Sequence, residues 1–287
     1  MAEGILRIGT CSWKYPSWVG LVYSRAGIDY LTEYAARYSS VEIDQWFWAM
    51  PVPAVAESYA GVVPSSFRFS VKAFNGLTRA TLPGRKGQPP KPNPDFLSPE
   101  LFAQFLEALG PLRAMTGVVM LQFEYLNKQK MASEEEFLRR LDSFLAVVPR
   151  DIPIAVETRN PNYLGAPYFK LLRERRVGHV FLQGYWMPPV AELYERCREL
   201  LLGPAVVRLH GPDREGMEVA TGGAWDRIVT PHDDELHGIA AMSMEMRKRG
   251  LDVYLNVNNH YEGSAPLTIQ KLLALGVSDS TPKDPAP

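Results

Sequence analysis

The sequence predicts an α/β protein that folds as a single (β/α)8 barrel of the TIM type. Short β-type runs alternate with helical patterns eight times, and such alternation requires a parallel sheet with right-handed crossovers. The length of 287 residues suits one barrel, and the 46% hydrophobic content suffices for one packed core. An open doubly wound sheet is the alternative. The segment after the first predicted strand, GTCSWKYPSW, lacks the glycine-rich phosphate fingerprint of that fold.

Each predicted strand is a short run of mostly β-type residues followed by an amphipathic pattern. The strands cover residues 6–12, 40–44, 67–73, 117–124, 153–159, 179–184, 205–211 and 252–258. The helices that follow them, in the same order, cover residues 29–38, 53–60, 98–110, 133–148, 166–176, 190–201, 232–250 and 264–276. Two helix starts carry capping signals: Ser98 precedes Pro99, and Ser133 forms a capping box with Glu136.

The chain is predicted to form one domain over residues 1–277, with a disordered tail over residues 278–287. The tail, SDSTPKDPAP, contains no core-forming residues. The loop at residues 75–94 is long and rich in proline and basic residues. Loops of this kind are usually lids, interaction segments or disordered.

Composition limits the classes of partner. The formal net charge of -1 and the pI of about 6.5 argue against nucleic acid as a general partner, although local basic patches stay open. Cys11 and Cys197 do not make a disulfide framework. No signal peptide or membrane-spanning run is recognisable, so we expect a cytoplasmic protein without a membrane partner. The sequence leaves the oligomeric state open.

Polar residues occur in pairs at the C-terminal ends of the predicted strands. Residues i and i+2 of a strand point to the same face, so we expect each pair to point towards the barrel axis. Cys11 has the opposite parity and is assigned to the helix-facing side. The pairs are Thr10/Ser12, Glu42/Asp44, Ser70/Lys72, Gln122/Glu124, Glu157/Arg159, Arg208/His210 and Asn256/Asn258, with Gln183 alone on the sixth strand.

Barrel active sites lie at this end of the strands, so the pairs predict a polar substrate site at the mouth. The alternative is an ion-pair network that satisfies itself and only rigidifies the barrel. We assign catalytic roles to Glu42, Glu157, Lys72 and His210. The two glutamates are acid/base candidates, Lys72 orients a hydroxyl or acts as a base, and His210 is a proton shuttle or metal ligand.

Substrate-binding roles go to residues that can clamp an anion, donate hydrogen bonds or stack on a ring. Arg159 and Arg208 can each hold a carboxylate or phosphate through two nitrogens. Ser264 is expected to cap the last helix, whose N-terminus beside the mouth is a predicted anion-binding corner. Basic residues near the strand ends favour an anionic small-molecule ligand. The full set is Trp13, Gln122, Arg159, Arg208, Asn256, Asn258 and Ser264.

Metal binding has only a weak signal in the sequence. There is no HExxH motif, no cysteine cluster and no EF-hand loop. We therefore assign no metal ligand and no cofactor. Glu42, Glu157, His210 and His260 could still converge on a divalent metal, and that alternative stays open.

Several segments together resemble the domain-of-unknown-function 72 family, in the family's order and over nearly the whole chain. They read IGTCSWKYPSW, VEIDQWFWAMP, FSVKA, LQFEYL, VETRNPNYL, VVRLHG and YLNVNNHYEGSAP. The resemblance implies a TIM-barrel-like fold and a family without an established reaction. The family's recurrent positions correspond here to Trp13, Glu42, Lys72, Gln122, Glu157, Arg159, Arg208, His210 and Asn258.

This chain departs from the family pattern in three places. The second strand is followed by Asp44 and then QWFW, Arg79 stands where a histidine is usual, and Glu124–Tyr125 replaces a proline pair. These changes put a histidine role in the third loop in doubt.

The sequence favours an enzyme that performs hydrolytic or isomerising acid/base chemistry on a small, polar, anionic metabolite. Two other readings stay open. One is a metal-dependent phosphodiesterase or nuclease-like enzyme, and the other is a non-catalytic protein that binds a small ligand.

Overall fold

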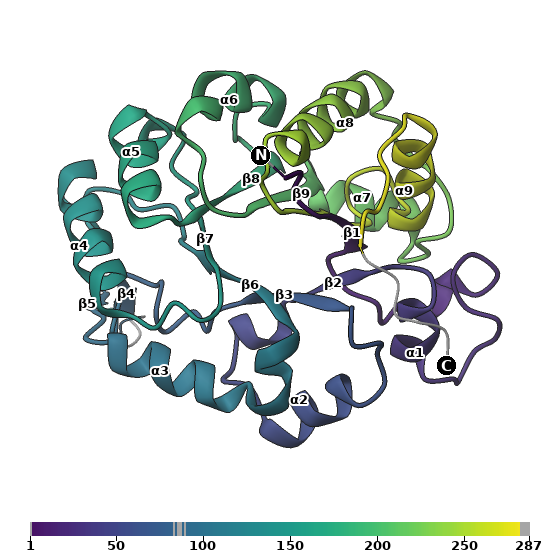
Figure 1. Cartoon of the computed structure of the whole chain (residues 1–287), viewed down its shortest axis with the longest axis horizontal. Helices are drawn as coiled ribbons and strands as arrows, with labels where there is room; N and C mark the ends of the chain where they lie inside the picture. Colours follow the sequence, from purple (N-terminus) through teal and green to yellow (C-terminus); the bar gives the residue numbers. More distant parts are fainter. Residues whose placement is uncertain (1, 83, 85–87, 89, 282–287) are drawn as a thin grey trace.

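Parallel strands close into an eight-stranded barrel in the computed structural model, which describes residues 2–82, 84, 88 and 90–281 (Figure 1). The predicted fold class is confirmed. Every neighbouring pair of barrel strands is parallel. Around the barrel the order is β1 (Leu6–Thr10), β10 (Val253–Val257), β9 (Ala205–Gly211), β8 (Gly178–Gly184), β7 (Ile154–Glu157), β6 (Thr116–Gln122), β3 (Arg68–Lys72) and β2 (Ser40–Ile43).

Helices surround the barrel on its outer side (Figure 1). They are α1 (Tyr30–Ala35), α2 (Pro53–Ala60), α3 (Pro99–Ala108), α4 (Glu134–Val147), α5 (Ala166–Arg175), α6 (Val190–Cys197), α7 (Arg214–Thr221), α8 (Asp233–Lys248) and α9 (Ala265–Ala274). Short 3-10 turns cover Pro16–Trp18, Gln45–Phe47, Gly110–Met115, Pro161–Tyr163 and Arg198–Leu200. The sequence did not predict α7, which begins where the Asp213 carboxylate accepts a hydrogen bond from the Gly216 backbone N–H at 2.9 Å.

The predicted helix caps are present at α3 and α4 but not at α9. Ser98 and Ser133 accept hydrogen bonds from the backbone N–H groups of Leu101 and Glu136, at 3.1 and 3.2 Å. Ser264, by contrast, makes no side-chain cap and is fully buried. Its predicted cap is wrong, because Asn259 Oδ1 accepts from the first N–H of the helix, that of Ala265, at 2.9 Å.

Two segments outside the barrel also make backbone contacts in the described part of the chain. Ser280 exchanges hydrogen bonds with Leu6 of β1, at 2.8 and 2.9 Å, so ordered chain extends past the predicted boundary at residue 277. Residues 282–287 lie outside the described part. In the 75–94 loop, β4 (Thr81–Leu82) pairs antiparallel with β5 (Lys91–Pro92), and residues 83, 85–87 and 89 lie outside the described part.

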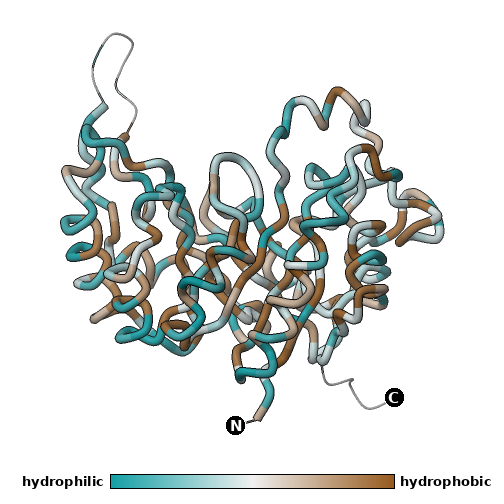
Figure 2. Tube along the Cα trace, turned by 90° about the horizontal axis from the view of Figure 1, so that it is seen from above, coloured by the Kyte–Doolittle hydropathy of each residue, from teal (hydrophilic) through white to brown (hydrophobic). Residues whose placement is uncertain are grey.

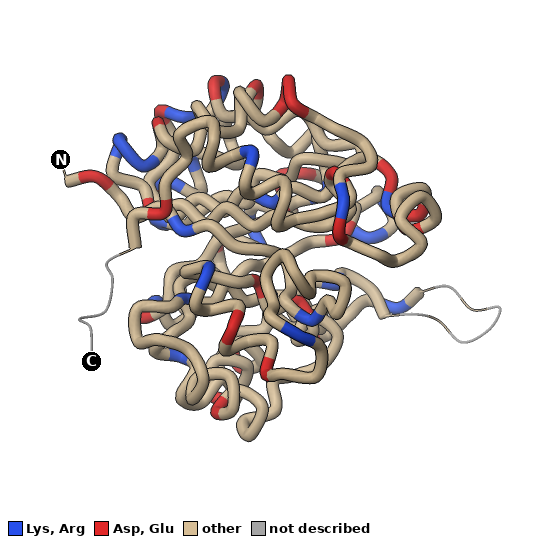
Figure 3. The backbone as a smooth tube through the Cα atoms, turned by 90° about the vertical axis from the view of Figure 1, so that its right-hand side faces the viewer, with Lys and Arg blue, Asp and Glu red and all other residues tan. Residues whose placement is uncertain are grey.

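The core has two parts. One lies between the strands and the helices, where Figure 2 shows apolar strand segments inside more hydrophilic helices. The other fills the lower half of the barrel interior with Val118, Met120, Ala155, Val180, Val206 and Tyr254. Positive and negative residues are mixed over the helices in the view of Figure 3. Among the described residues, no helix is both long and apolar enough to cross a membrane.

Candidate active site at the barrel mouth

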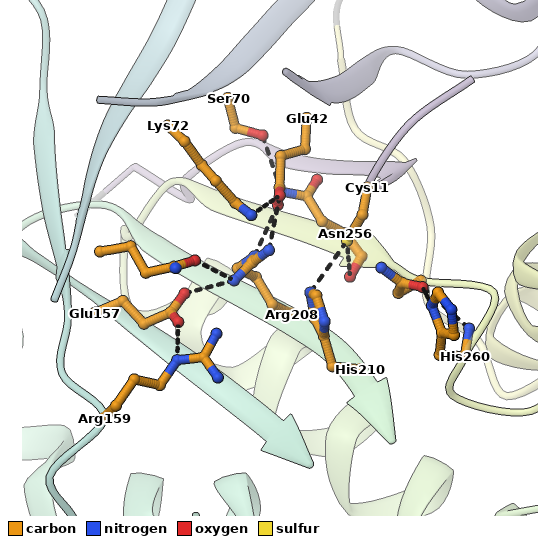
Figure 4. A network of polar contacts seen from close by, with 12 residues as sticks. Cys11, Glu42, Ser70, Lys72, Glu157, Arg159, Arg208, His210, Asn256 and His260 are labelled. Atoms are coloured by element: carbon orange, nitrogen blue, oxygen red, sulfur yellow. Dashed lines mark hydrogen bonds and ion pairs between the residues drawn. The ribbon is translucent and has the colours of Figure 1, made fainter. Parts of the chain in front are cut away.

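The polar pairs face the barrel interior on most strands, as the alternation predicts. The residues between them, such as Ile43, Val71 and Leu209, belong to the core under the helices. The polar side chains come together above the apolar lower layer. Those that Figure 4 shows in one network of contacts are Cys11, Glu42, Ser70, Lys72, Glu157, Arg159, Arg208, His210 and Asn256.

The prediction was wrong on the first and sixth strands of the sequence pattern. The Thr10 hydroxyl lies 2.9 Å from the hydroxyl of Tyr34 on α1, so Thr10 faces the helices. Gln183 likewise donates to Glu235 of α8 at 2.9 Å. On β1 the inward-facing position is Gly9. Because glycine has no side chain, the sequence does not show which residues of this strand point inward and which point to the helices. Cys11, assigned to the helix side, therefore points inward instead.

Arg208 is the centre of a buried ion network. Its Nε and Nη2 bind the two oxygens of Glu42 at 2.8 and 2.7 Å, and its Nη1 binds Glu157 Oε2 at 2.6 Å (Figure 4). Gln122 Oε1 accepts a further bond from Nη1 at 3.3 Å. Arg208, Glu42 and Glu157 are each at most 1% exposed. The predicted role of Arg208 as a ligand clamp does not fit this arrangement, because its guanidinium nitrogens already bind the carboxylates of Glu42 and Glu157.

Two further cations continue the network towards the mouth. Lys72 Nζ lies 3.4 Å from Glu42 Oε1, and Arg159 Nε lies 2.6 Å from Glu157 Oε1. Their side chains are 11% and 15% exposed, so both reach solvent. An aromatic ring backs each one: Phe47 lies 5.7 Å from Lys72 Nζ, and Tyr185 lies 5.0 Å from the Arg159 guanidinium carbon. The network thus contains three cations, Lys72, Arg159 and Arg208, against the carboxylates of Glu42 and Glu157.

His210 lies beside the network, between a thiol and a phenol. Its Nε2 is 3.7 Å from Cys11 Sγ, and its Nδ1 is 3.5 Å from the Tyr185 hydroxyl. Asn256 donates through Nδ2 to Ser70 Oγ at 2.9 Å, and its buried Oδ1 has no partner among the described residues. His210 and Asn256 therefore lie where the sequence predicted them.

The local charges fix the protonation states at the base of the mouth. Burial raises the pKa of Glu157, but Arg159, Arg208 and Lys72 outweigh burial and hold this pKa at about 2. Burial lowers the pKa of His210 well below its usual value, and Arg208, Lys72 and Arg159 lower it further. Burial, with Glu42, raises the pKa of the Cys11 thiol. At neutral pH the site therefore presents a carboxylate, a neutral imidazole and a thiol, and Glu157 is a poor proton donor.

Three residues predicted for substrate binding lie apart from the network. Trp13 is 5% exposed and packs edge to face on Tyr59 of α2 at 5.0 Å. The Asn258 side chain accepts from the His260 backbone N–H at 3.0 Å, which orients that turn. Ser264 is enclosed near the start of α9, where the chain's own carboxylate, Glu262, accepts from Thr268 at 2.7 Å.

The donor set considered for a divalent metal does not converge. Glu42 and Glu157 both bind Arg208, and His260 Nε2 lies 3.1 Å from Glu218. No group of three or more His, Cys, Asp or Glu side chains suited to a metal ion occurs among the described residues. The residues of the mouth therefore do not fit this alternative.

Sequence reasoning missed Cys11, Phe47 and Tyr185. A signal for Tyr185 was available, because an aromatic residue directly follows a glycine at the end of a strand. A cavity of about 560 Å³ opens at the opposite end of the barrel, lined by strand starts such as Gly117 and Pro204. None of the inward polar pairs lines that cavity, so we place the candidate site at the mouth.

The model of a family described as protein of unknown function DUF72 matches residues 7–287. The chain belongs to the DUF72 family. Its similarity to YunF of Bacillus subtilis (strain 168), a UPF0759 protein, is 24% identity over 268 residues, covering 85% of this chain and 86% of YunF. The UPF0759 protein YecE of Escherichia coli (strain K12) is 28% identical over 159 residues, which cover 55% of this chain and 50% of YecE.

Solved DUF72 structures share the fold. That of a DUF72 protein from Enterococcus faecalis V583 has a TM-score of 0.66 at 20% identity, covering 98% of this chain and 100% of the other. One from Thermotoga maritima MSB8 has a TM-score of 0.65 at 19% identity, covering 96% and 100%. Outside the family, a D-tagatose 3-epimerase-like protein has a TM-score of 0.52 at 14% identity, covering 94% and 96%.

Proposed function

We propose that this DUF72 protein binds a small anionic metabolite at the barrel mouth and performs acid/base chemistry on it, hydrolytic or isomerising. One observation carries the proposal: the buried network holds three cations against two carboxylates, and two of the cations face the mouth. A network that only rigidified the barrel would not need positive groups left over at its solvent edge.

The two outer cations have donors to spare. Arg159 uses Nε on Glu157, and its terminal nitrogens have no partner among the described residues. Lys72 has three donors and one ion-pair partner, Glu42. Asp44 is exposed at the rim and interacts with Lys72, so the charge of Lys72 is offset and Arg159 is the outer cation with the most donors to spare. A phosphate or carboxylate beside Arg159 would complete its hydrogen bonding.

His210 is the group that we assign to proton transfer. Its pKa is low in the free protein partly because Arg208, Lys72 and Arg159 repel an added proton. An anion bound beside these cations would offset that repulsion and raise the pKa, so ligand binding would make the imidazole a better base. The Tyr185 hydroxyl and the Cys11 thiol are its neighbours for relaying a proton. Glu42 and Glu157 then anchor the cations rather than carry protons.

The reaction class rests on these residues and not on structural likeness. The D-tagatose 3-epimerase-like neighbour shares the barrel at 14% identity, which concerns the fold alone. A protein that binds the same anion without turning it over is the second candidate, and the same mouth supports it.

The test is ligand binding followed by turnover. Phosphates and carboxylates are screened by thermal shift, since a ligand stabilises the state that binds it. We expect Arg159→Gln to lose the stabilisation, while Arg140→Gln, which removes an exposed ion pair with Glu136 on α4, keeps it. Each hit is then incubated with the protein and followed by NMR, where conversion identifies an enzyme. The proposal fails if no anion stabilises the wild type or if Arg159→Gln binds equally well.

A further inference from the structure

Trp186 is an exposed indole that the structure holds in one place. It directly follows Tyr185 after β8 and is 60% exposed. Its Nε1 donates a hydrogen bond to the backbone carbonyl of Arg159 at 3.2 Å. Single exposed apolar side chains are common on protein surfaces, so the exposure of Trp186 alone indicates no function. This one is tethered beside the cation that carries the unused donors of the mouth.

Tyr185, which lies next to Trp186 and Arg159, has an unusual backbone conformation. Its φ is 55°, a left-handed value that bulky residues rarely adopt and that recurs at functional sites. The cause is local: the register shifts at Gly184, and the Tyr185 N–H donates to the Gly211 carbonyl at 3.1 Å. A Cβ at Gly184 would lie 2.3 Å from that same oxygen. The tight strand end therefore directs the Tyr185 ring onto Arg159 and its hydroxyl towards His210.

We propose that Arg159, Tyr185 and Trp186 form a subsite, here called the β8 subsite, for a ligand that joins an anionic group to a six-membered sugar or aryl ring. The anion binds the terminal nitrogens of Arg159, and the ring stacks on the Trp186 indole. The β8 subsite rests on the proposed function, because it assumes that the mouth binds an anion. It adds the class of ligand: a ring-bearing phosphate or carboxylate rather than a small open-chain anion.

The structure offers a matched control across the mouth. Trp48 is 71% exposed and follows Phe47 after β2, in the way that Trp186 follows Tyr185 after β8. In the barrel order, three strands separate β2 from β8 on either side, so the two tryptophans follow opposite strands. Trp48 differs in two respects. No hydrogen bond from its indole N–H occurs among the described residues, and the cation on its side, Lys72, already interacts with Asp44.

The experiment compares ligand pairs that differ by a ring. Dissociation constants are measured by titration calorimetry for inorganic phosphate against phenyl phosphate and glucose 6-phosphate, and for acetate against benzoate. The proteins are the wild type, Trp186→Ala, Trp186→Phe and Trp48→Ala. Stacking on an aromatic side chain is expected to tighten binding of the ring-bearing ligand about tenfold. That gain should vanish in Trp186→Ala, persist largely in Trp186→Phe and persist in Trp48→Ala, while phosphate alone binds all four proteins equally.

The outcomes distinguish failure of the β8 subsite from failure of the anion site at the mouth. If phosphate and phenyl phosphate bind the wild type equally, and the sugar phosphate and benzoate also show no gain, the β8 subsite is wrong while the anion site stands. If none of these anions binds the wild type, the proposed function fails as well. A loss in Trp48→Ala equal to that in Trp186→Ala overturns the assignment to β8. A gain confined to the phenyl compounds or to glucose 6-phosphate supports the subsite and identifies the ring.

Discussion

The orientation of Arg208 could be predicted from the sequence, but its ion-pair partners could not. Alternation along the strand predicted that it points inward, because parity depends only on local sequence. Its partners could not be predicted, because Glu42 and Glu157 lie 166 and 51 residues away and meet it only when the barrel closes. The same limit explains Cys11. With Gly9 at the preceding inward position, the sequence does not reveal the phase of the first strand.

Replacing Arg208 with methionine should destabilise the protein severely. The change leaves Glu42 and Glu157 buried, each at most 1% exposed, without the guanidinium between them. Removing one partner of a buried ion pair costs about 3–5 kcal/mol. Urea unfolding measures the loss, with Arg140→Met as a control, because that exposed pair on α4 should cost less than ~1 kcal/mol. A loss for Arg208→Met no larger than the control would show that the network adds nothing to stability.

Glu157 predicts a dependence of stability on acid pH. Its pKa falls from 4.5 to about 2 in the folded chain, so the folded state favours the carboxylate. The resulting stabilisation is present in full above about pH 4.5 and is lost as the pH falls towards 2. This stabilisation amounts to about 3 kcal/mol. Unfolding free energies measured between pH 2 and 6 should fall less steeply in Glu157→Gln than in the wild type. Equal slopes would contradict this origin.

At the level of elements, the sequence located strands and most helices but not their junctions. The missed helix, α7, is short and contains Gly216, so its helical pattern is weak. Helix α9 was located correctly and its cap was not, since Ser264 stands at the expected position while Asn259 reaches the first N–H. The ends of β8, β9 and β10 depend on close backbone approaches. A Cβ on Gly211 would lie 2.5 Å from the His260 carbonyl oxygen.

Alanine substitutions at Gly211 and Gly223 distinguish the cost of backbone strain from the cost of steric crowding. Both have a φ of 76°, so alanine suffers the same conformational strain of about 1 kcal/mol at each position. Only at Gly211 does the new methyl group meet backbone, since nothing lies within 4 Å at Gly223. We expect Gly211→Ala to lose at least ~2 kcal/mol more than Gly223→Ala in urea unfolding. It should also weaken ligand binding, because Tyr185 and His210 both lie at this junction. Similar losses of unfolding free energy in the two variants would show that close backbone packing at Gly211 adds no cost beyond the strain.

At the scale of the whole molecule, the chain combines a near-neutral net charge with two cations, Lys72 and Arg159, at the solvent edge of the barrel mouth. The repeated alternation of strand and helix predicted the barrel, because each unit carries its own local pattern. The balance of charges at the mouth was not predictable by counting. Counted from the sequence alone, the formal charges of the inward carboxylates and cations nearly cancel. In the folded chain Glu42 and Glu157 are enclosed below, and the donors of Arg159 remain at the edge.

This distribution predicts that anions reach the mouth more readily than cations do, although the net charge is -1. Tryptophan fluorescence can report it, because Trp13, Trp18, Trp46 and Trp225 are at most 8% exposed, whereas Trp48 and Trp186 are 71% and 60% exposed. At low ionic strength, iodide should quench the emission more strongly than caesium. About 0.5 M salt should remove most of the difference, because its Debye length is well below 10 Å. Trp186→Phe should reduce the preference for iodide more than Trp48→Phe, since Arg159 lies beside Trp186. Quenching by caesium that matches or exceeds quenching by iodide would place the positive region elsewhere and remove the electrostatic basis for an anionic ligand.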